Sequence, residues 1–330
     1  MSAHMALRLT LACGASDRTL PLILGDVQPQ GIDLTFLRMY PEEVFWRMTR
    51  HAEFDAAEMS MSSYMLRRSR GDESVMAIPV FTSREFRHSC VWIHADSGIT
   101  KPADLKNKRV GAAEWQLTAN LWIRGFLSDD YDIQPKDLRW YLGGLYQPGR
   151  IEKLALQIPG VELNAIGPGQ TLSQMLQDGE LDAVIGPRPP HGFPGSRVRR
   201  LFEDFKAVEM DYFQRTRIFP IMHTVVIRRD VLDRDPWVAR SLYDAFCEAK
   251  RRAMAELGNP VVLSTSLPWQ VAEEEATRAL MGDDYWPYGL EPNRRALETL
   301  MRYSREQGIA ERSVPIETLF AASTLDDYRI

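Results

Sequence analysis

The first sixty residues alternate short strand-like segments with helical ones, and this alternation restricts the fold more than any other feature of the sequence. Residues 7–13 alternate apolar and polar side chains, residues 31–37 carry β-branched and aromatic side chains typical of a strand, and residues 54–59 form a third short strand-like segment. Residues 19–24 can open a helix, and residues 41–49 carry apolar side chains on one helical face. Strands separated by helices pair in parallel, and ligands then bind at the carboxyl ends of the strands. The sequence therefore predicts an α/β protein.

Length and one internal segment predict two lobes. The chain has 330 residues, which is roughly twice the usual size of one domain. Residues 99–111 resemble the entry into the second lobe of type II periplasmic binding proteins, where a short helix precedes the first strand of that lobe. We expect the strands of the second lobe at residues 109–113, 138–142, 162–166 and 181–185.

The predicted fold class is a two-lobed α/β protein of the type II periplasmic-binding-protein kind. Its sheets would be mixed, with helices on both faces and a cleft between the lobes. We expect residues 1–97 to begin the first lobe, residues 98–187 to form the second, and residues 188–330 to cross back and complete the first. The loops after the strands would line the cleft, so candidate functional residues are sought there.

Composition argues against nucleic acid and membranes as partners. The net charge is −5, and the lysines and arginines form no run that would attract a phosphate backbone. No apolar run approaches the length that spans a bilayer. We therefore expect neither partner, and a homo-oligomer remains open.

The cysteines and the N-terminus indicate a cytoplasmic protein. Cys13, Cys90 and Cys247 are odd in number, far apart and flanked by apolar residues. This usage is typical of small buried side chains in a reducing compartment rather than of a disulfide framework. Residues 1–5 have the character of a tag remnant or a short leader, without the apolar core of a signal peptide.

Motifs for several common chemistries are missing. The chain contains no GxSxG elbow, no phosphate-binding loop and no GxGxxG dinucleotide fingerprint. Its six histidines are scattered, without HExxH or other metal-ligand spacing. We predict no metal and no cofactor, and a metal site built from His88, His223 and Glu114 stays open as the less favoured alternative.

One candidate for chemistry is the segment 83–89, which precedes a predicted extended segment at residues 88–94. Arg84, Arg87 and His88 lie within five residues, so they could clamp a carboxylate and supply a proton. Ser89 could add a hydroxyl donor. The alternative is a solvated loop in which the histidine packs passively.

Two further candidates are a carboxylate and a histidine. Glu114 and Trp115 end the predicted strand 109–113, where a helix should begin, so Glu114 could exchange protons or merely be a helix N-terminal acid. His223 lies at the start of a predicted strand, beside an apolar run. It could be a catalytic residue or a buried core residue whose ring nitrogens are hydrogen-bonded.

Three loops complete the set of candidates. Prolines around Arg188 fix the backbone where the chain should return to the first lobe, and they could aim this arginine into the cleft. Arg18 lies in the first loop after a strand. Glu58 and Ser60 end the third predicted strand at the same edge of the sheet.

These segments, taken in order, resemble the 4,5-dihydroxyphthalate decarboxylase family over nearly the whole chain. The most specific combination is Arg87-His88-Ser89, followed by Glu114-Trp115-Gln116 and then by Pro220-Ile221-Met222-His223. The other matching stretches are residues 17–19, 31–34, 58–60, 143–145, 148–150, 288–290 and 293–294.

The resemblance implies a carboxy-lyase that needs no cofactor. Its substrate would be a small aromatic polycarboxylate, 4,5-dihydroxyphthalate, and its products 3,4-dihydroxybenzoate (protocatechuate) and CO2. His88 is the preferred proton donor to the ring, Glu114 would accept the phenolic proton or hold the hydroxyls, and His223 would support either role. The residues expected to bind substrate are Arg18, Glu58, Ser60, Arg87, Ser89, Trp115 and Arg188. The alternative function is a solute-binding protein of an ABC transporter, for an aromatic acid or an oxyanion.

Overall fold

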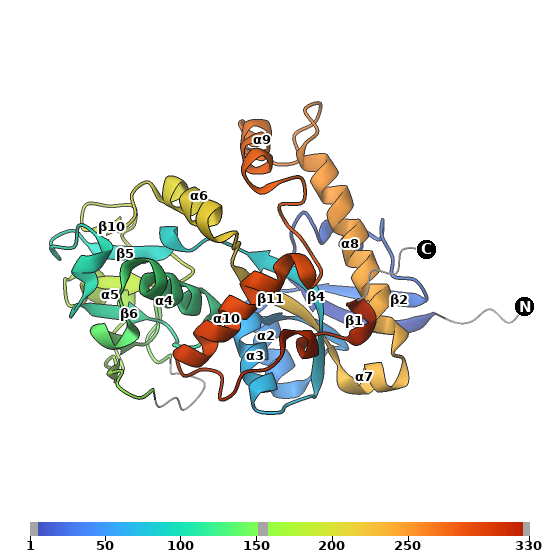
Figure 1. Ribbon diagram of the computed structural model, residues 1–330, viewed down its shortest axis with the longest axis horizontal. Coiled ribbons are helices and arrows are strands. Elements are labelled where there is room, and N and C mark those ends of the chain that lie inside the picture. Colours follow the sequence, from blue (N-terminus) through green and yellow to red (C-terminus); the bar gives the residue numbers. More distant parts are fainter. Residues whose placement is uncertain (1–5, 151–157, 326–330) are drawn as a thin grey trace, which may run out of the picture. The chain divides into compact units, whose positions relative to one another are not determined.

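The computed structural model describes residues 6–150 and 158–325, so residues 1–5, expected to be a tag remnant or a short leader, lie outside the described residues. By their contacts the residues divide into two compact units (Figure 1). The first unit comprises Met1–Arg84, Ile221–Leu297 and Val314–Ile330, and the second comprises Glu85–Pro220 and Glu298–Ser313.

The first unit is built around a mixed sheet. In the described residues its strands are β1 (Leu7–Cys13), β2 (Ile32–Arg38), β3 (Ala56–Ser60), β4 (Val75–Arg84) and β11 (Ile221–Arg228). Their order in the sheet is β2-β1-β3-β11-β4. Strand β1 pairs in parallel with β2 and β3, whereas β11 runs antiparallel to both β3 and β4. The carboxyl ends of β1, β3 and β4 therefore meet at one edge, together with the amino end of β11.

Helices cover both faces of this sheet. They are α1 (Leu20–Leu24), α2 (Pro41–His51), α3 (Met61–Ser69), α7 (Arg229–Arg234) and α8 (Trp237–Leu257), while α9 (Gln270–Met281) packs on α8 away from the sheet. Because β2 and β3 lie on opposite sides of β1, right-handed crossovers place α1 and α2 on opposite faces. Helix α8 packs against α1 and β4, while α2 and α3 contact β3.

Helix α8 shows how the spacing of apolar residues predicts an amphipathic helix. The predicted helix begins at Asp235-Pro236, and its apolar stripe is Val238, Leu242, Phe246 and Ala249. All four side chains are buried. Their spacing of three or four residues places them on one face, which packs on the sheet while charged side chains face water.

The second unit is built around another mixed sheet. Its strands in the described residues are β5 (Val91–His94), β6 (Arg109–Ala112), β7 (Arg139–Leu142), β8 (Leu163–Ala165), β9 (Ala183–Ile185) and β10 (Val198–Arg200). Their order is β10-β5-β9-β6-β7-β8, with β6 to β9 parallel and with β5 antiparallel to β9 and β10. The helices are α4 (Thr118–Tyr131), α5 (Leu172–Gln177), α6 (Phe205–Thr216) and the later turns of α10 (Arg294–Glu306). All four strands that we predicted for this lobe are present, within two residues of the expected bounds.

The contacts divide the chain at different positions from those predicted. The predicted boundaries fall after residues 97 and 187, whereas the contacts divide the chain at Arg84 and at Pro220. The difference arises because β5 and β10 pair with each other in the second sheet, and β5 also pairs with β9. Both strands therefore belong to the second unit.

The start of β5 also differs from the prediction. We expected one extended segment over residues 88–94, but His88–Cys90 form a short 3₁₀ turn and the strand begins only at Val91. His88 and His94 therefore do not share a strand face.

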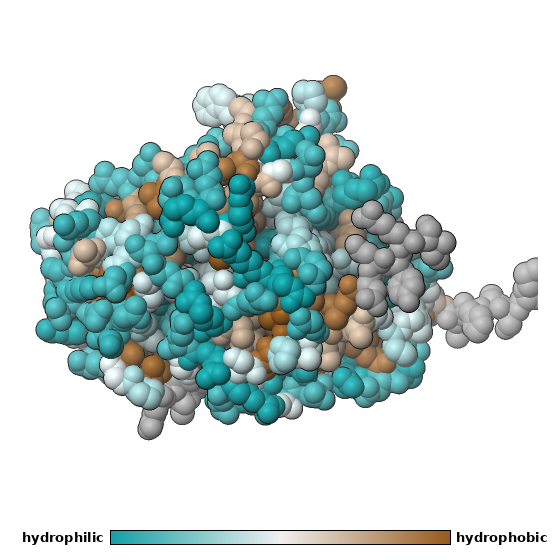
Figure 2. Space-filling view, viewed as in Figure 1, coloured by the Kyte–Doolittle hydropathy of each residue, from teal (hydrophilic) through white to brown (hydrophobic). Residues whose placement is uncertain are grey.

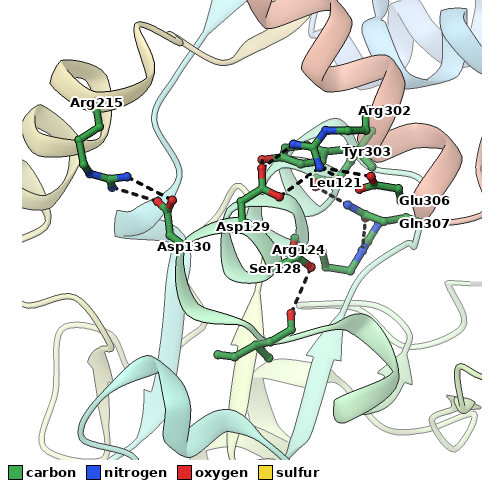
Figure 3. A network of polar contacts seen from close by, with 11 residues as sticks. Leu121, Arg124, Ser128, Asp129, Asp130, Arg215, Arg302, Tyr303, Glu306 and Gln307 are labelled. Carbon is green, nitrogen blue, oxygen red and sulfur yellow. Dashed lines mark hydrogen bonds and ion pairs between the residues drawn. The ribbon is translucent and has the colours of Figure 1, made fainter.

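The later turns of α10 complete the second unit by packing against α4 (Figure 3). Gly125 of α4 leaves room for the Tyr303 ring, because a Cβ atom there would lie 2.1 Å from that ring. The hydroxyl of Tyr303 donates to Asp129 at 2.6 Å, and the Arg302 guanidinium pairs with the same carboxylate. The Arg124 Nε donates to the side-chain oxygen of Gln307 at 2.6 Å.

The face of the molecule drawn in Figure 2 is mostly hydrophilic, with apolar side chains scattered among charged ones. None of the helices in residues 6–150 and 158–325 has both the length and the apolar character required of a membrane span.

Candidate functional site

The first unit gathers polar side chains at the strand edge described above. Arg18 follows β1, Glu58 and Ser60 end β3, Thr82 lies near the end of β4, and His223 lies near the start of β11. In the pairing register His223 stands opposite Ser60, so Glu58, Ser60 and His223 share one face of the sheet.

Glu58 and His223 form a hydrogen-bonded pair at this edge. The Nδ1 atom of His223 lies 2.7 Å from Oε1 of Glu58. Glu58 is buried, whereas 21% of the His223 side chain is exposed. A carboxylate can only accept, so Nδ1 carries the proton of this bond and Nε2 is left as the ring atom that can exchange a proton with a ligand.

The surroundings of Glu58 keep its carboxylate ionised. Burial alone would raise its pKa, but hydrogen bonds lower it to about 2. They come from His223, from the Gly14 N–H at 2.8 Å and from the Thr82 hydroxyl at 2.9 Å. The Cys13 thiol is a weaker donor at 3.4 Å. This carboxylate is therefore a fixed charge that orients His223 at any ordinary pH.

The backbone and an aromatic ring set the direction of His223. The pairing of β11 with β4 is irregular on both sides of His223, and such irregularities turn a strand side chain out of the regular pleat. The edge of the imidazole meets the Phe45 ring of α2, with 4.8 Å between the ring centroids.

Arg18 lies beside this pair. Its Nη1 donates to Asp17 at 2.6 Å, and its Nη2 donates to the backbone oxygen of Thr82 at 3.3 Å. The guanidinium lies flat on the Trp286 ring, 3.6 Å from the ring centroid. Thr82 thus contacts both Arg18 and Glu58, which holds the cation next to the histidine pair.

A second arginine lies in the same region. Arg84, at the end of β4, is buried and donates to the backbone oxygen of Pro287 at 3.1 Å. Burial lowers its pKa to about 9, and the positive charge of Arg18 contributes to this shift. The two cations are therefore close enough to interact.

In the second unit, His88 has a different environment. Its ring stacks on Phe126 at 4.0 Å between centroids and meets the rings of Phe202 and Tyr212. Only 2% of its side chain is exposed, and neither ring nitrogen has a hydrogen-bond partner among the described residues. Burial lowers its pKa to about 4, with a smaller contribution from Arg215. His88 is therefore a neutral ring within an aromatic cluster.

The neighbours of His88 form their own polar group around a glutamate. Glu209 of α6 accepts the N–H of Ser89 at 3.1 Å, and its carboxylate lies 4.0 Å from Nδ1 of His88. Arg87 is buried and pairs with Glu85 at 2.9 Å. Arg87, His88 and Ser89 thus lie together, and the partners named here, Glu85 and Glu209, belong to the same unit.

Glu114 and Trp115 lie between β6 and α4. The buried carboxylate of Glu114 accepts from Nε of Arg150 at 2.7 Å. Helix α4 begins only at Thr118, so Glu114 precedes its first turn and is not the helix N-terminal acid considered above. Trp115 is fully buried, and its Nε1 donates to the backbone oxygen of Gln307 at 2.9 Å.

Arg188 is half-buried in the segment after β9. In the part of the chain that the structure describes, no three His, Cys, Asp or Glu side chains form a group suited to a metal ion.

The structure thus brings Arg18, Glu58, Ser60 and His223 together in the first unit. Sequence reasoning considered Arg84 for a carboxylate clamp without including it among the expected substrate-binding residues, and it missed Thr82 and Trp286, which hold Arg18. Only proximity to the segment 83–89 could have indicated Thr82. Nothing local could have indicated Trp286, because it lies about two hundred residues from β4 in the chain.

Comparisons with known proteins add two kinds of similarity. No model of a protein family matches the chain. Two curated relatives do match. A 4,5-dihydroxyphthalate decarboxylase of Comamonas testosteroni is 40% identical over 327 residues, covering 98% of this chain and 99% of the relative. One of Pseudomonas putida is 43% identical over 211 residues, covering 63% of this chain and 82% of the relative.

Solved structures share the fold at low identity. The periplasmic aliphatic sulphonate binding protein SsuA of Escherichia coli has a TM-score of 0.55 at 12% identity, over 96% of this chain and 98% of that protein. The alkanesulfonate-binding SsuA of Xanthomonas axonopodis pv. citri, bound to MOPS, has a TM-score of 0.51 at 11% identity, over 96% and 97%. The predicted fold class, that of periplasmic binding proteins, is confirmed.

Proposed function

Because the chain belongs to the 4,5-dihydroxyphthalate decarboxylase family, we propose that it converts 4,5-dihydroxyphthalate into 3,4-dihydroxybenzoate and CO2. The family makes the chain a carboxy-lyase, and both curated relatives carry the name of this reaction. The identity of the substrate in this chain is the part that an experiment must establish.

The chemistry of this substrate needs no electron sink other than its own ring. Loss of the proton from the hydroxyl para to one carboxylate pushes electron density onto the ring carbon that bears this carboxylate. Protonation of that carbon gives a dienone. The bond to the carboxylate then breaks, CO2 leaves, and the electron pair of that bond restores the aromatic ring. The protein must supply a proton, a base and groups that hold the ring in place.

The observation that carries the proposal is the Glu58–His223 pair next to Arg18. His223 is partly exposed, and its Nδ1 is fixed by an ionised carboxylate, so Nε2 can deliver a proton to a bound ring. Thr82 bonds both Arg18 and Glu58, so Arg18 lies next to the Glu58–His223 pair. From there it can hold a carboxylate of the same ligand.

The geometry favours His223 over His88 as the proton donor. A donor must reach the substrate, and the His88 ring is enclosed by aromatic side chains and stays neutral above about pH 4. The roles expected for Arg87, Ser89, Glu114, Trp115 and Arg188 remain proposals, to be tested with the same kinetic measurement.

The direct test incubates the purified protein with 4,5-dihydroxyphthalate and follows 3,4-dihydroxybenzoate by chromatography and released CO2 by trapping. We expect turnover in the wild type and in His51→Gln, an exposed histidine outside the site, and a loss of turnover in His223→Gln. Tight binding without any turnover would support the alternative, a solute-binding protein.

We also propose that the protein works in the cytoplasm. Cys13, Cys90 and Cys247 are all free thiols, which fits a reducing compartment. Cell fractionation with an antibody against the chain tests this, and recovery in the periplasmic fraction would contradict it.

A further inference from the structure

The loop after α9 places a buried tyrosine beside two residues that contact arginines. The ring of Trp286 lies against Arg18, and the backbone oxygen of Pro287 accepts from Arg84. Tyr288 is 6% exposed, and its Oη atom is buried without a hydrogen-bond partner among the described residues. Leaving a buried hydroxyl unsatisfied costs free energy, so native proteins rarely do so without a reason. A ligand that supplies an acceptor is one such reason.

The charges around Tyr288 suit an anionic acceptor. Burial raises the pKa of Tyr288, so its hydroxyl keeps its proton and is a donor. Arg18 is the charged group with the largest effect on it, and Arg84 in turn is affected by Tyr288. A hydroxyl donor on the segment that contacts both guanidinium groups, through Trp286 and Pro287, matches what a carboxylate oxygen requires.

Arg18 also has a buried donor without a hydrogen-bond partner among the described residues. Its Nη1 and Nη2 atoms are bonded to Asp17 and to the backbone of Thr82, whereas its Nε atom is buried without a hydrogen-bond partner in the described part of the chain. The guanidinium lies flat on Trp286, which fixes its plane. Arg18 and Tyr288 thus each keep one buried donor unused.

The loop that carries Tyr288 is held firmly to β4. Nε1 of Trp286 donates to the backbone oxygen of Phe81 at 2.8 Å, and the Gly289 N–H donates to that of Pro79 at 2.8 Å. Gly289 has a φ of +90°, a conformation that side chains rarely adopt. From α8, Lys250 lies over the Tyr288 ring at 5.2 Å and bonds Asp284. The unused donors are therefore fixed before any ligand arrives.

We infer that the Tyr288 hydroxyl and the Arg18 Nε–H together bind the carboxylate that stays on the ring. This inference rests on the proposed decarboxylation. The assignment to the retained carboxylate follows from charge: cations that stabilise a carboxylate oppose its loss as CO2, so the group held by arginine is the one that remains.

The test measures equilibrium binding rather than turnover, with phthalate, 3,4-dihydroxybenzoate and catechol as probes. Phthalate and 3,4-dihydroxybenzoate carry the retained carboxylate, and catechol carries none. We expect Tyr288→Phe to weaken the binding of both acids by about 10-fold and to leave catechol binding within twofold. Its melting temperature should not fall, because the lost hydroxyl has no hydrogen-bond partner among the described residues.

Tyr303→Phe is the matched control. Its hydroxyl is bonded to Asp129 in the second unit, so this variant should have a lower melting temperature and an unchanged affinity for both acids. Arg18→Lys should weaken the same two acids. In the double variant Arg18→Lys/Tyr288→Phe the affinity for both acids should fall by less than the product of the two single fold-losses, because both donors bind the same carboxylate.

An affinity of Tyr288→Phe for phthalate within twofold of the wild type overturns the inference, and so does the absence of phthalate binding to the wild type. The proposed function fails separately. If the wild type binds phthalate through Tyr288 but does not decarboxylate 4,5-dihydroxyphthalate, the carboxylate site stands and the reaction is rejected.

Discussion

His223 in the first unit and His88 in the second each have a glutamate close to Nδ1. The two pairs differ in the distance between the side chains and in the exposure of the histidine. The His223 nitrogen lies 2.7 Å from Glu58, whereas the His88 nitrogen lies 4.0 Å from Glu209. The exposed fractions of the two side chains are 21% and 2%. A glutamate beside a histidine is therefore not by itself a catalytic pair.

The two glutamates show the cause of the difference. Glu58 receives hydrogen bonds from His223, Gly14 and Thr82, and together these outweigh burial and lower its pKa to about 2. Burial raises the pKa of Glu209, although the N–H of Ser89 partly opposes this. A carboxylate with several donors stays charged and can orient a histidine. A carboxylate with few donors, next to aromatic rings, is suited to packing.

The largest expected effect is a difference in turnover between variants of the two histidines. His223→Gln should lower kcat by about 100-fold to 10,000-fold, because a positioned proton donor contributes on that order. His88→Gln should leave kcat per folded molecule within about threefold. Steady-state kinetics, with the folded fraction measured by circular dichroism, checks both. The reverse ranking would return the proton transfer to His88.

A smaller loss is expected when the charge of the paired carboxylate is removed. Glu58→Gln keeps the shape of the side chain but takes away the ionised acceptor, so kcat should fall about 100-fold with little change in KM. Glu209→Gln is the matched variant in the second unit, and its kcat should stay within about threefold. Equal losses in both variants would remove the distinction between the two pairs.

The pH dependence of stability tests the buried state of His88. Its pKa in the folded protein is about 4, below the ordinary value of 6.5. The unfolded chain therefore takes up a proton on this residue first as pH falls, so the contribution of His88 to stability should be lost between about pH 6.5 and pH 4. In His88→Phe the decline in stability over this range should be smaller by on the order of 3 kcal/mol. Urea unfolding at pH 7 and pH 4 measures it, with His51→Gln as control. An unchanged decline would show that His88 is protonated in the folded state.

The smallest expected effect concerns a single donor to Glu58. Thr82→Val keeps the volume of the side chain and removes the hydroxyl, which costs about 1 kcal/mol, or roughly a fivefold loss in kcat. Because the lost hydroxyl bonds Glu58, while the backbone oxygen that holds Arg18 is kept, KM should not change. A KM effect larger than the kcat effect would mean that Thr82 contacts the ligand directly.

The fold could be predicted largely from local patterns. Strand β1 follows from apolar alternation, β2 from its β-branched and aromatic residues, and α8 from its apolar stripe, whereas β6 and β7 are expected from the resemblance of residues 99–111 to the entry of a second lobe. Helix α6 gives no such signal, because only Tyr212 and Phe213 of its twelve residues are buried. Strand β10 has three residues, too few for a pattern.

The site could be predicted only in part. The rule that ligands bind at the carboxyl ends of strands indicated Arg18, Glu58 and Ser60 correctly as neighbours. The bond between Glu58 and His223 joins residues 165 positions apart and depends on the register of β11. The sequence around His88 contains the same residue types as a catalytic loop. What decides its role is the burial supplied by Phe126 and Phe202, which come from distant segments.

The division of the second unit between two parts of the chain has a consequence for its synthesis. Residues 298–313 complete that unit, yet roughly eighty residues must be added after Pro220 before they leave the ribosome, which takes several seconds at typical rates. During that interval Trp115 and Arg124 lack Gln307, their partner from the C-terminal segment. The second unit can therefore complete its packing only after the C-terminal segment has been made.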